Sequence, residues 1–238
     1  MSRRASSSLT LARLAADVEA CRACPRLVAW REEVARTRRR AHRDEIYWGR
    51  GVPGFGDPDA RILLLGLAPG AHGANRTGRM FTGDASGVFL WPALHRAGLA
   101  SRPESLGRDD GLDLRDAFVS NAARCAPPGN RPDPPELRRC ARFLDRELAA
   151  LGELRVVVAL GAIAWDAALR ALMRAGHALP RPRPRFGHCA ELVLPGAPVL
   201  LGCYHPSQQN TRTGKLTAGM LDEVLARARS ISRSAPAR

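Results

Sequence analysis

Short, unbroken apolar runs recur along this chain of 238 residues, and each lies between turn-forming or charged positions. A run of about four to eight residues that is apolar at consecutive positions is typical of a strand buried on both faces of a parallel sheet. The pattern predicts strands at residues 61–65, 117–120, 155–160 and 198–202.

The stretches between these runs have apolar residues at helical spacing. A basic segment, residues 10–40, precedes the first strand, and the other expected helices are residues 86–97, 135–151, 162–174 and 216–229. Strands that alternate with helices are typical of a parallel sheet with helices on both faces and right-handed crossovers. We therefore expect an α/β fold, a three-layer α/β/α sandwich around a central, mostly parallel four-stranded sheet.

The length is that of one domain with one good core. Residues 1–238 are expected to form it, with disordered tails at about residues 1–8 and 230–238. No apolar run approaches the roughly 18 residues of a membrane span, so no membrane association is expected. The basic start of the chain has no apolar stretch for a secretory signal, and an organelle transit peptide is the alternative interpretation of its Arg- and Ser-rich composition.

The charge predicts a polyanionic partner. The formal net charge is +14, and Lys215 is the only lysine, so arginine carries nearly all of the positive charge. A genome rich in G and C explains a preference for arginine over lysine, but not an excess of basic over acidic residues. That excess predicts salt-sensitive binding to nucleic acid.

Two loops that follow predicted strands carry polar residues suited to chemistry. The run at residues 199–203 leads into residues 205–214, which begin with His-Pro-Ser and continue with amides, hydroxyls and one arginine. The run at residues 62–65 leads into residues 66–79, which are rich in glycine and arginine. In α/β folds, ligands bind where loops leave the carboxyl ends of the strands, so both loops lie where a site is expected.

The chain has six cysteines and no secretory signal, so metal ligation or burial is expected instead of disulfides. Cys21 and Cys24 form a C-x2-C pair, and fourteen residues separate Cys125 from Cys140. Two pairs of cysteines indicate a site with four thiolates. The residues alone leave zinc and a [4Fe–4S] cluster both open.

Three separated segments, in this order along the chain, resemble the motifs of one family. Residues 66–79, 121–131 and 205–216 are similar to the first, middle and last motifs of the uracil-DNA glycosylase superfamily, in its iron–sulfur B-type branch, family 5. The resemblance covers roughly residues 17–228. It implies a base-excision repair enzyme that hydrolyses the N-glycosidic bond of uracil, hypoxanthine and xanthine in double-stranded DNA and leaves an abasic site. It also implies a monomer of the bacterial cytoplasm that associates with the nucleoid.

The resemblance assigns the cysteines as well. Four of them match the ligands of the family's [4Fe–4S] cluster: Cys21, Cys24, Cys125 and Cys140. We expect this cluster to be structural, because the reaction moves no electron. Cys189 and Cys203 match no ligand, and their apolar surroundings predict buried thiols.

Three side chains match the family's base-binding residues. By resemblance, His205 faces the pyrimidine O2, where a neutral imidazole donates a hydrogen bond to the charge that develops on the departing base. Asn121 is expected to read the flipped base with its donor and acceptor, and Phe81 to stack on it. Each has a plainer interpretation: a loop-capping histidine, an asparagine that ends a strand, and a core phenylalanine.

The first motif departs from that of the A-type iron–sulfur branch, which has a Glu directly after its first glycine to orient the attacking water. Leu67 stands at that position here. It fits the wider range of deaminated bases that the B-type branch implies. The backbone N–H groups of the turn at Leu67, Ala68 and Gly70 are expected to contact a base oxygen or a phosphate. Asp84 is the candidate that activates water or stabilises the sugar cation, with a helix N-cap as its alternative role.

Polar residues of both loops are expected to contact the DNA backbone, and the tip of the second loop to enter the duplex. The expected contacts are Asn75, Arg76, Arg79, Ser207, Gln208, Asn210, Thr211 and Arg212, with the last two at the tip. Residues 71–73 lack the basic insertion of relatives that link to DNA covalently, so covalent capture is not expected. A non-catalytic iron–sulfur DNA-binding relative with a degenerate site is the alternative function.

Overall fold

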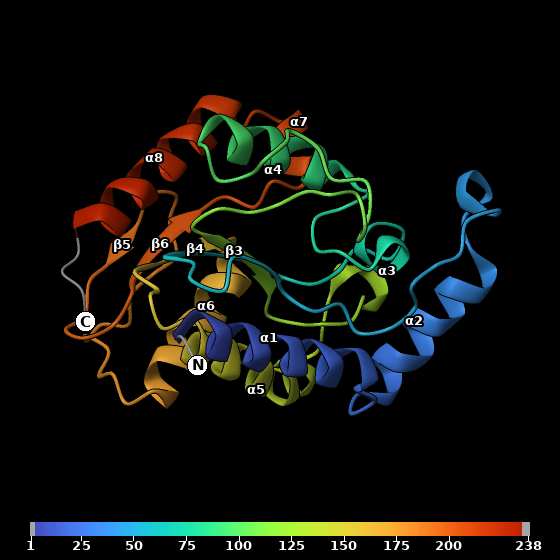
Figure 1. The fold of residues 1–238 in the computed structure, drawn as a ribbon, viewed down its shortest axis with the longest axis horizontal. Coiled ribbons are helices and arrows are strands. Elements are labelled where there is room, and N and C mark those ends of the chain that lie inside the picture. Colours follow the sequence, from blue (N-terminus) through green and yellow to red (C-terminus); the bar gives the residue numbers. More distant parts are fainter. Residues whose placement is uncertain (1–2, 235–238) are drawn as a thin grey trace.

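The computed structural model describes residues 3–234, and a six-stranded sheet forms its centre (Figure 1). Four parallel strands lie within one residue of the predicted runs: β2 (Ile62–Gly66), β3 (Ala117–Asn121), β4 (Val156–Leu160) and β6 (Val199–Cys203). All residues of β2, β3 and β4 are buried. This explains why these strands appear in the sequence as continuous apolar runs.

The prediction of a four-stranded sheet is wrong, because it omits two edge strands. β1 (Phe55–Gly56) pairs antiparallel with β3, and β5 (Glu191–Leu192) pairs antiparallel with β6. The strand order is β1-β3-β2-β4-β6-β5. Each edge strand has two residues and is only partly buried, so neither produces an apolar run in the sequence.

The four parallel strands end at the same edge of the sheet. Gly66 is paired with Asn121, and Leu160 is paired with Cys203. From β2 the chain passes to β3 on one side and then to β4 on the other. Such a switch in strand order is the place where α/β folds bind ligands.

Helices cover both faces of the sheet, so the predicted three-layer α/β/α arrangement is confirmed (Figure 1). On one face, α4 (Ala85–Arg96) and α8 (Ala218–Ser234) pack on the sheet through one apolar core. On the other face, α5 (Pro134–Ala150) and α6 (Ala162–Arg174) pack on it through a second core.

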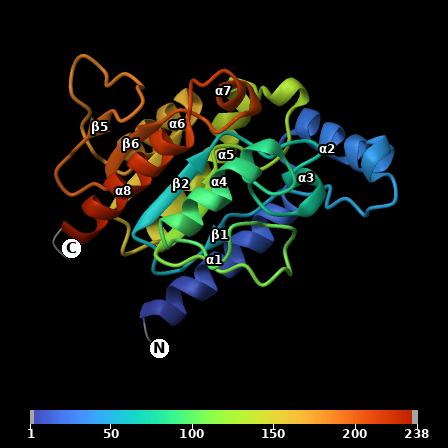
Figure 2. The same ribbon diagram turned by 90° about the horizontal axis from the view of Figure 1, so that it is seen from above.

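The basic segment at residues 10–40 is two helices and not the single one predicted. α1 (Arg3–Ala20) packs along α5, whereas α2 (Pro25–Thr37) extends to one end of the molecule (Figures 1 and 2). The break falls at residues 21–24, directly before Pro25. Proline is disfavoured inside a helix but suits its first turn, so it begins a new helix here.

The predicted disordered tails are wrong for the residues that the structure describes. Residues 3–8 belong to α1, and residues 230–234 belong to α8. The remainder of that prediction, residues 1–2 and 235–238, lies outside the described residues. No helix within residues 3–234 is both long and apolar enough to span a membrane.

Short helical turns interrupt the loops that the sequence left without structure. α3 (Ala74–Thr77) lies in the loop after β2, and α7 (Gln208–Arg212) lies in the loop after β6. Two 3-10 turns occupy Arg40–His42 and Pro128–Asn130. Both expected site loops are therefore folded against the edge of the sheet.

Candidate active site

The edge of the sheet brings together residues from four loops. A Cβ atom on Gly66 would overlap both the Oδ1 of Asn121 and the ring of Phe81. The ring centroids of Phe81 and His205 are 6.3 Å apart. A Cβ on Gly161, directly after β4, would lie 3.3 Å from the Cβ of His205. The three predicted base-binding side chains thus lie together at this edge of the sheet, and the glycines at positions 66 and 161 allow their close approach.

Asn121 ends β3 with a side chain that is only 2% exposed. Its Nδ2 donates to the thioether sulfur of Met80 at 2.7 Å, and sulfur is a weak acceptor. Its Oδ1 is buried and has no hydrogen-bond partner among the described residues. A buried carbonyl without a partner costs about 1–3 kcal/mol. Asn121 therefore presents an unused acceptor at the site, which a ligand's N–H group can satisfy.

Phe81 adopts a backbone conformation that is rare for a bulky residue, with φ at 51°. A left-handed residue of this kind costs roughly 1–2 kcal/mol. The indole N–H of Trp91 donates to the carbonyl of Phe81 at 2.6 Å, and Gly87 packs against the same carbonyl. These contacts hold the strained residue in place. The ring belongs to the apolar core on one side and lies against Gly66 on the other. The core interpretation of Phe81 is confirmed, and stacking on a flipped base stays a prediction.

His205 is half-buried, and burial lowers its pKa to about 4. The imidazole is therefore neutral at neutral pH, the state in which one ring nitrogen donates and the other accepts. The side-chain amide of Asn210 donates to the backbone carbonyl of His205 at 2.9 Å. His205 is thus held from within its own loop, while its ring faces the ring of Phe81.

Asp84 has the capping role, and it also lies at the motif turn. Its Oδ1 accepts a hydrogen bond from the backbone N–H of Gly87 at 3.0 Å, which caps α4. Its Oδ2 faces the turn after β2, because a Cβ on Gly70 would lie 2.9 Å from that oxygen and one on Gly73 would overlap it. Burial raises the pKa of Asp84, opposed by the backbone N–H groups that it accepts and by the charge of Arg76.

The turn that contains Leu67, Ala68 and Gly70 is tied to the end of β3. The carbonyl of Leu67 accepts the N–H of Ala123 at 2.9 Å. The carbonyl of Gly70 accepts the N–H groups of Gly73 and Asn75 at 3.2 and 3.0 Å. These bonds place the backbone of the turn beside Asn121, which follows from the pairing of β2 with β3.

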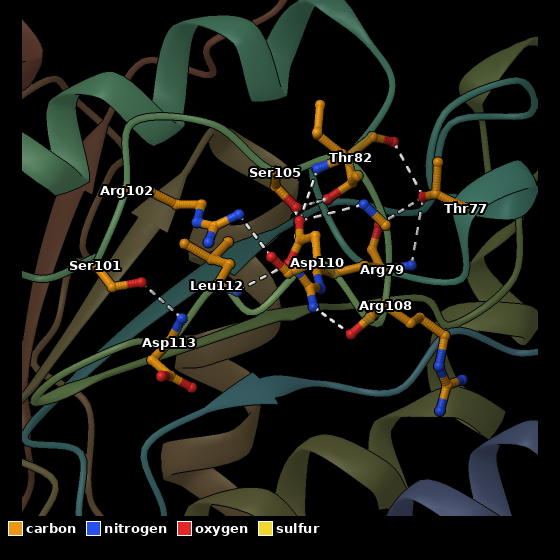
Figure 3. A network of polar contacts seen from close by, with 12 residues as sticks. Thr77, Arg79, Thr82, Ser101, Arg102, Ser105, Arg108, Asp110, Leu112 and Asp113 are labelled. Atoms are coloured by element: carbon orange, nitrogen blue, oxygen red, sulfur yellow. Dashed lines mark hydrogen bonds and ion pairs between the residues drawn. The ribbon is translucent and has the colours of Figure 1, made fainter.

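Arg79 is not on the surface where a DNA contact was expected. Its side chain is 4% exposed and forms an ion pair of 2.6 Å with Asp110, which is 7% exposed (Figure 3). The guanidinium also donates to Ser105 Oγ at 3.2 Å and to the Arg108 carbonyl at 2.5 Å. Hydrogen bonds from backbone N–H groups and from Arg79 outweigh desolvation and lower the pKa of Asp110 to about 2. Arg79 therefore clamps the first motif to the loop at residues 101–115, and its prediction as a DNA contact is corrected.

Asn75 is also buried, with its Nδ2 donating to the backbone carbonyl of Arg31 at 3.1 Å. It holds α2 against the first motif, so a role in contacting DNA is corrected here too. Arg76 is mostly buried and pairs with Glu45, and its Nε donates to the His72 carbonyl at 2.9 Å. Its charge is thus already partnered within the protein.

The loop after His205 forms a compact cap and not an extended tip. Ser207 Oγ accepts from the N–H of Asn210 at 3.4 Å and so caps α7. Ser207 and Asn210 therefore shape this loop. Thr211 is half-buried, and its hydroxyl donates to the carbonyl of Ser207 at 3.2 Å. Of the contacts predicted in this loop, Gln208 and Arg212 are exposed.

Four cysteines gather at one end of the molecule: Cys21 after α1, Cys24 before α2, Cys125 after β3 and Cys140 in α5. Burial raises the pKa of Cys24, Cys125 and Cys140, in the last case to about 12, and the neighbouring thiols add to each shift. The four thiols are therefore close enough to interact electrostatically. Within residues 3–234, no three potential ligands converge on the position of a single metal ion.

Nitrogen donors surround these sulfur atoms. Arg31 donates to Cys125 Sγ at 2.9 Å, and the backbone N–H of Arg124 donates to Cys140 Sγ at 3.2 Å. The Arg31 side chain is 1% exposed, and its guanidinium has no ion pair with a carboxylate of the described residues. A buried charge requires an opposite charge. The guanidinium of Arg31 contacts Cys125 Sγ and the carbonyl of Cys21, and the carboxylate of Glu32 interacts with it electrostatically.

The other two cysteines differ from each other. Cys203 is buried in β6, whereas Cys189 is exposed in a loop and has a φ of 59°. The prediction that Cys189 is buried is wrong. Its apolar neighbours in the sequence point into the protein, while the turn directs the thiol outward.

The chain matches a known protein family over most of its length. The family model described as the uracil DNA glycosylase superfamily matches residues 53–229. The chain belongs to the uracil-DNA glycosylase superfamily. All of the candidate base-binding residues and Asp84 lie inside the matched range. The family membership expected from the three motifs is therefore confirmed.

Individual relatives in the superfamily match most of the chain. The chain is 59% identical over 213 residues to the Type-5 uracil-DNA glycosylase of Thermus thermophilus, covering 90% of this chain and 94% of that protein. It is 51% identical over 224 residues to the Type-5 uracil-DNA glycosylase of Mycobacterium bovis, covering 94% and 82%. It is 31% identical over 163 residues to the Type-4 uracil-DNA glycosylase of Pyrobaculum aerophilum, covering 68% and 74%.

The sequence did not reveal the supporting residues of the site. Gly161 packs against His205, Asp110 holds Arg79, and Arg31 contacts the thiol group. Only Gly161 has a local signal, because it follows directly after a predicted strand. The other two depend on partners that are 31 and 94 residues away in the chain.

Proposed function

We propose that this protein is a monofunctional uracil-DNA glycosylase that hydrolyses the bond between a base and its deoxyribose in double-stranded DNA and leaves an abasic site. One observation carries this proposal: the unused Oδ1 acceptor of Asn121 is buried beside the strained Phe81 and the neutral His205. Such a set offers an acceptor, a stacking face and a donor to one planar base. Membership of the superfamily supports the same reaction.

The base must first leave the helical stack, which costs a few kcal/mol and is cheapest at a mismatched pair. Phe81 then stacks on the flipped base, a contact worth about 1–3 kcal/mol. Asn121 Oδ1 accepts the N3–H of uracil. The transition state is oxocarbenium-like, with negative charge on the departing base and positive charge on the sugar.

His205 donates to the O2 of the departing base, where negative charge accumulates. Because its pKa is about 4, the ring acts as a hydrogen-bond donor without being a cation. Asp84 Oδ2 lies at the turn after β2. In the proposed reaction, the sugar of the flipped nucleotide binds near this carboxylate, which orients water and stabilises the sugar cation. Its other oxygen continues to cap α4.

We further propose that hypoxanthine and xanthine are substrates. Leu67 stands where the A-type branch has a glutamate, so the turn offers backbone groups without an additional charged side chain. A site that reads the base mainly by stacking and by one amide discriminates less among deaminated bases. The proposal extends to a monomer that acts on bacterial DNA in the cytoplasm.

The four clustered cysteines fit a [4Fe–4S] cluster. Four mutually interacting thiols and the buried cation Arg31 suit a group that carries net negative charge. A four-iron cluster takes its thiolates at separate corners, so the sulfur atoms need not converge on one point as they do around a single ion. When bound, the cluster would hold the end of α1, the start of α2, the loop after β3 and α5 together. The residues proposed to take part in base excision are not ligands of the cluster.

The test is a single-turnover assay with excess protein on duplexes labelled at one 5′ end. Each duplex holds one uracil, hypoxanthine, xanthine or thymine opposite its partner base, and alkali then cleaves only at abasic sites. We expect uracil to be excised by the wild type, and Asn121→Ala to lose most of this activity. His177→Ala, beyond the far end of α6, is the matched histidine control for His205→Ala. DNA binding without cleavage of any substrate would establish the non-catalytic alternative.

A further inference from the structure

Besides a bond from Cys203 Sγ to the carbonyl of Tyr204 at 3.3 Å, three hydrogen bonds hold the backbone that carries His205 out of the sheet. The carbonyl of Cys203 accepts the N–H of Gly161 at 2.8 Å, and the carbonyl of His205 accepts Asn210 Nδ2 at 2.9 Å. Between them, the N–H of Tyr204 donates to the Nδ1 of His188 at 3.2 Å. The bond to His188 involves a side chain 16 positions away in the chain, in a segment that has no part in the proposed reaction.

Backbone hydrogen bonds hold the segment around His188 against β6. Backbone bonds of 2.8 Å link Cys189 to Gly202 and Gly202 to Ala190, so this segment lies along β6. A Cβ on Gly202 would overlap the carbonyl of Gly187, which shows how closely the two segments approach. His188 is therefore fixed through its backbone as well as its ring.

The ring of His188 stacks on the ring of Tyr204, with centroids 4.9 Å apart and 22° between the planes. Phe186 packs edge-on against Tyr204 at 6.2 Å, and the ammonium of Lys215 lies 5.0 Å above the same ring. Tyr204 is thus enclosed by groups from two loops. Its peptide has little freedom while these contacts hold.

The hydrogen bond specifies the protonation state of His188. Nδ1 accepts an N–H and so carries no proton, which places the proton of the neutral ring on Nε2. Nε2 is buried and has no partner among the described residues. Burial lowers the pKa of His188 and the charge of Glu223 opposes this shift, so the neutral ring is favoured. The unpaired Nε2–H lowers the stability of the folded state, whereas Nδ1 accepts the hydrogen bond from the Tyr204 amide.

We propose that His188 is a positioning residue for His205: by holding the Tyr204 amide, its Nδ1 sets the direction in which the next side chain leaves β6 toward the base. This inference rests on the proposed glycosylase function. The contact acts on the reacting atoms only through His205. A displacement of about 1 Å at a catalytic group can cost about 100-fold in rate.

Two variants separate the hydrogen bond from the stacking. His188→Asn places an amide oxygen where Nδ1 was and keeps the acceptor, but loses most of the stacking on Tyr204. His188→Phe keeps the aromatic contact and removes the acceptor. We expect the single-turnover rate on uracil-containing duplex to stay within about threefold for the Asn variant and to fall about 10–100-fold for the Phe variant. DNA affinity should be unchanged in both.

Thermal stability should rank the variants in the opposite order, because the phenylalanine retains more buried contact area. Hydrogen–deuterium exchange at the Tyr204 amide gives a readout that does not depend on activity: protection should persist with Asn and be lost with Phe. The proposal would be overturned if the two variants ranked in the same order by rate as by melting temperature, or if the Phe variant kept the wild-type rate. A wild type that is inactive on every base, with Tyr204 protection unchanged in the Phe variant, would refute both. Inactivity with protection lost only in the Phe variant would refute the proposed function alone.

Discussion

Replacing Asp84 by asparagine separates its two roles, because the side chain touches both α4 and the motif turn. The asparagine side chain would keep an oxygen in reach of the Gly87 N–H, which lies 3.0 Å from Asp84 Oδ1 in the wild type. Asparagine and aspartate are about equally good N-caps. The substitution therefore removes the charge at the Gly70–Gly73 turn and leaves the cap in place.

The effect on stability follows from the direction of the pKa shift. Burial raises the pKa of Asp84 above its ordinary value of 3.8, so the folded protein binds this proton more tightly than the unfolded chain. The carboxyl then contributes stability below pH 3.8, and that contribution is lost as the pH rises through the folded pKa. At neutral pH the charged form is a burden, partly offset by about 0.3–1 kcal/mol from the helix N-terminus. Asp84→Asn should therefore change stability by less than about 1 kcal/mol, or a few degrees in melting temperature.

The single-turnover rate should change far more than the stability. A carboxylate that activates water contributes about 10²–10⁴-fold, so Asp84→Asn should lower the single-turnover rate by that factor. The wild-type rate should fall with acid from above pH 3.8, because the raised pKa protonates the base early, and the Asn variant should lack this fall. Asp84→Ala is the control: it loses the cap as well, at about 1 kcal/mol. Calorimetry and the labelled-duplex assay on the same samples measure both. An Asn variant with wild-type rate would show that Asp84 only caps α4.

Four further predictions follow from the site and the charge. His205→Ala should lower the single-turnover rate by about 10²–10³ with DNA affinity unchanged, and near-wild-type turnover would refute its role. Anaerobically purified protein should be brown, absorb near roughly 400 nm and lose iron on Cys140→Ser; stoichiometric zinc without iron or sulfide would contradict the cluster. Asp110→Asn should lower the free energy of unfolding by about 3–5 kcal/mol in urea titrations, because it strands the buried Arg79 charge; an unchanged midpoint would contradict this. Affinity for undamaged duplex should fall steeply with salt, since the net charge is +14, and a flat response would argue against an arginine-based DNA surface.

The positions of His205, Asn121 and the motif turn could be inferred because their signals are local. Each follows an apolar run, and parallel strands end at a common edge of the sheet. Asp84 shows a limit of such inference: the sequence offered a cap or a catalytic carboxylate as alternatives, whereas its two oxygens face both places.

The burial of Arg79 and the exposure of Cys189 could not be inferred from the sequence. Arg79 lies in a polar motif, and nothing nearby shows that Asp110, 31 residues later, encloses it. Cys189 has apolar neighbours, but a left-handed turn directs its thiol to the surface. The burial of a charged side chain depends on whether a partner reaches it through the fold.

The layered α/β fold, the four parallel strands and the loops at their carboxyl ends could all be predicted from the order of residues. A strand covered on both faces is apolar at most of its positions, so it appears in the sequence as a run of consecutive apolar residues. The two edge strands, the buried Arg79–Asp110 pair, the lowering of the His205 pKa to about 4 and the bond from Tyr204 to His188 became visible only in the folded chain. These depend on desolvation and on contacts between distant segments, which exist only once the chain has folded.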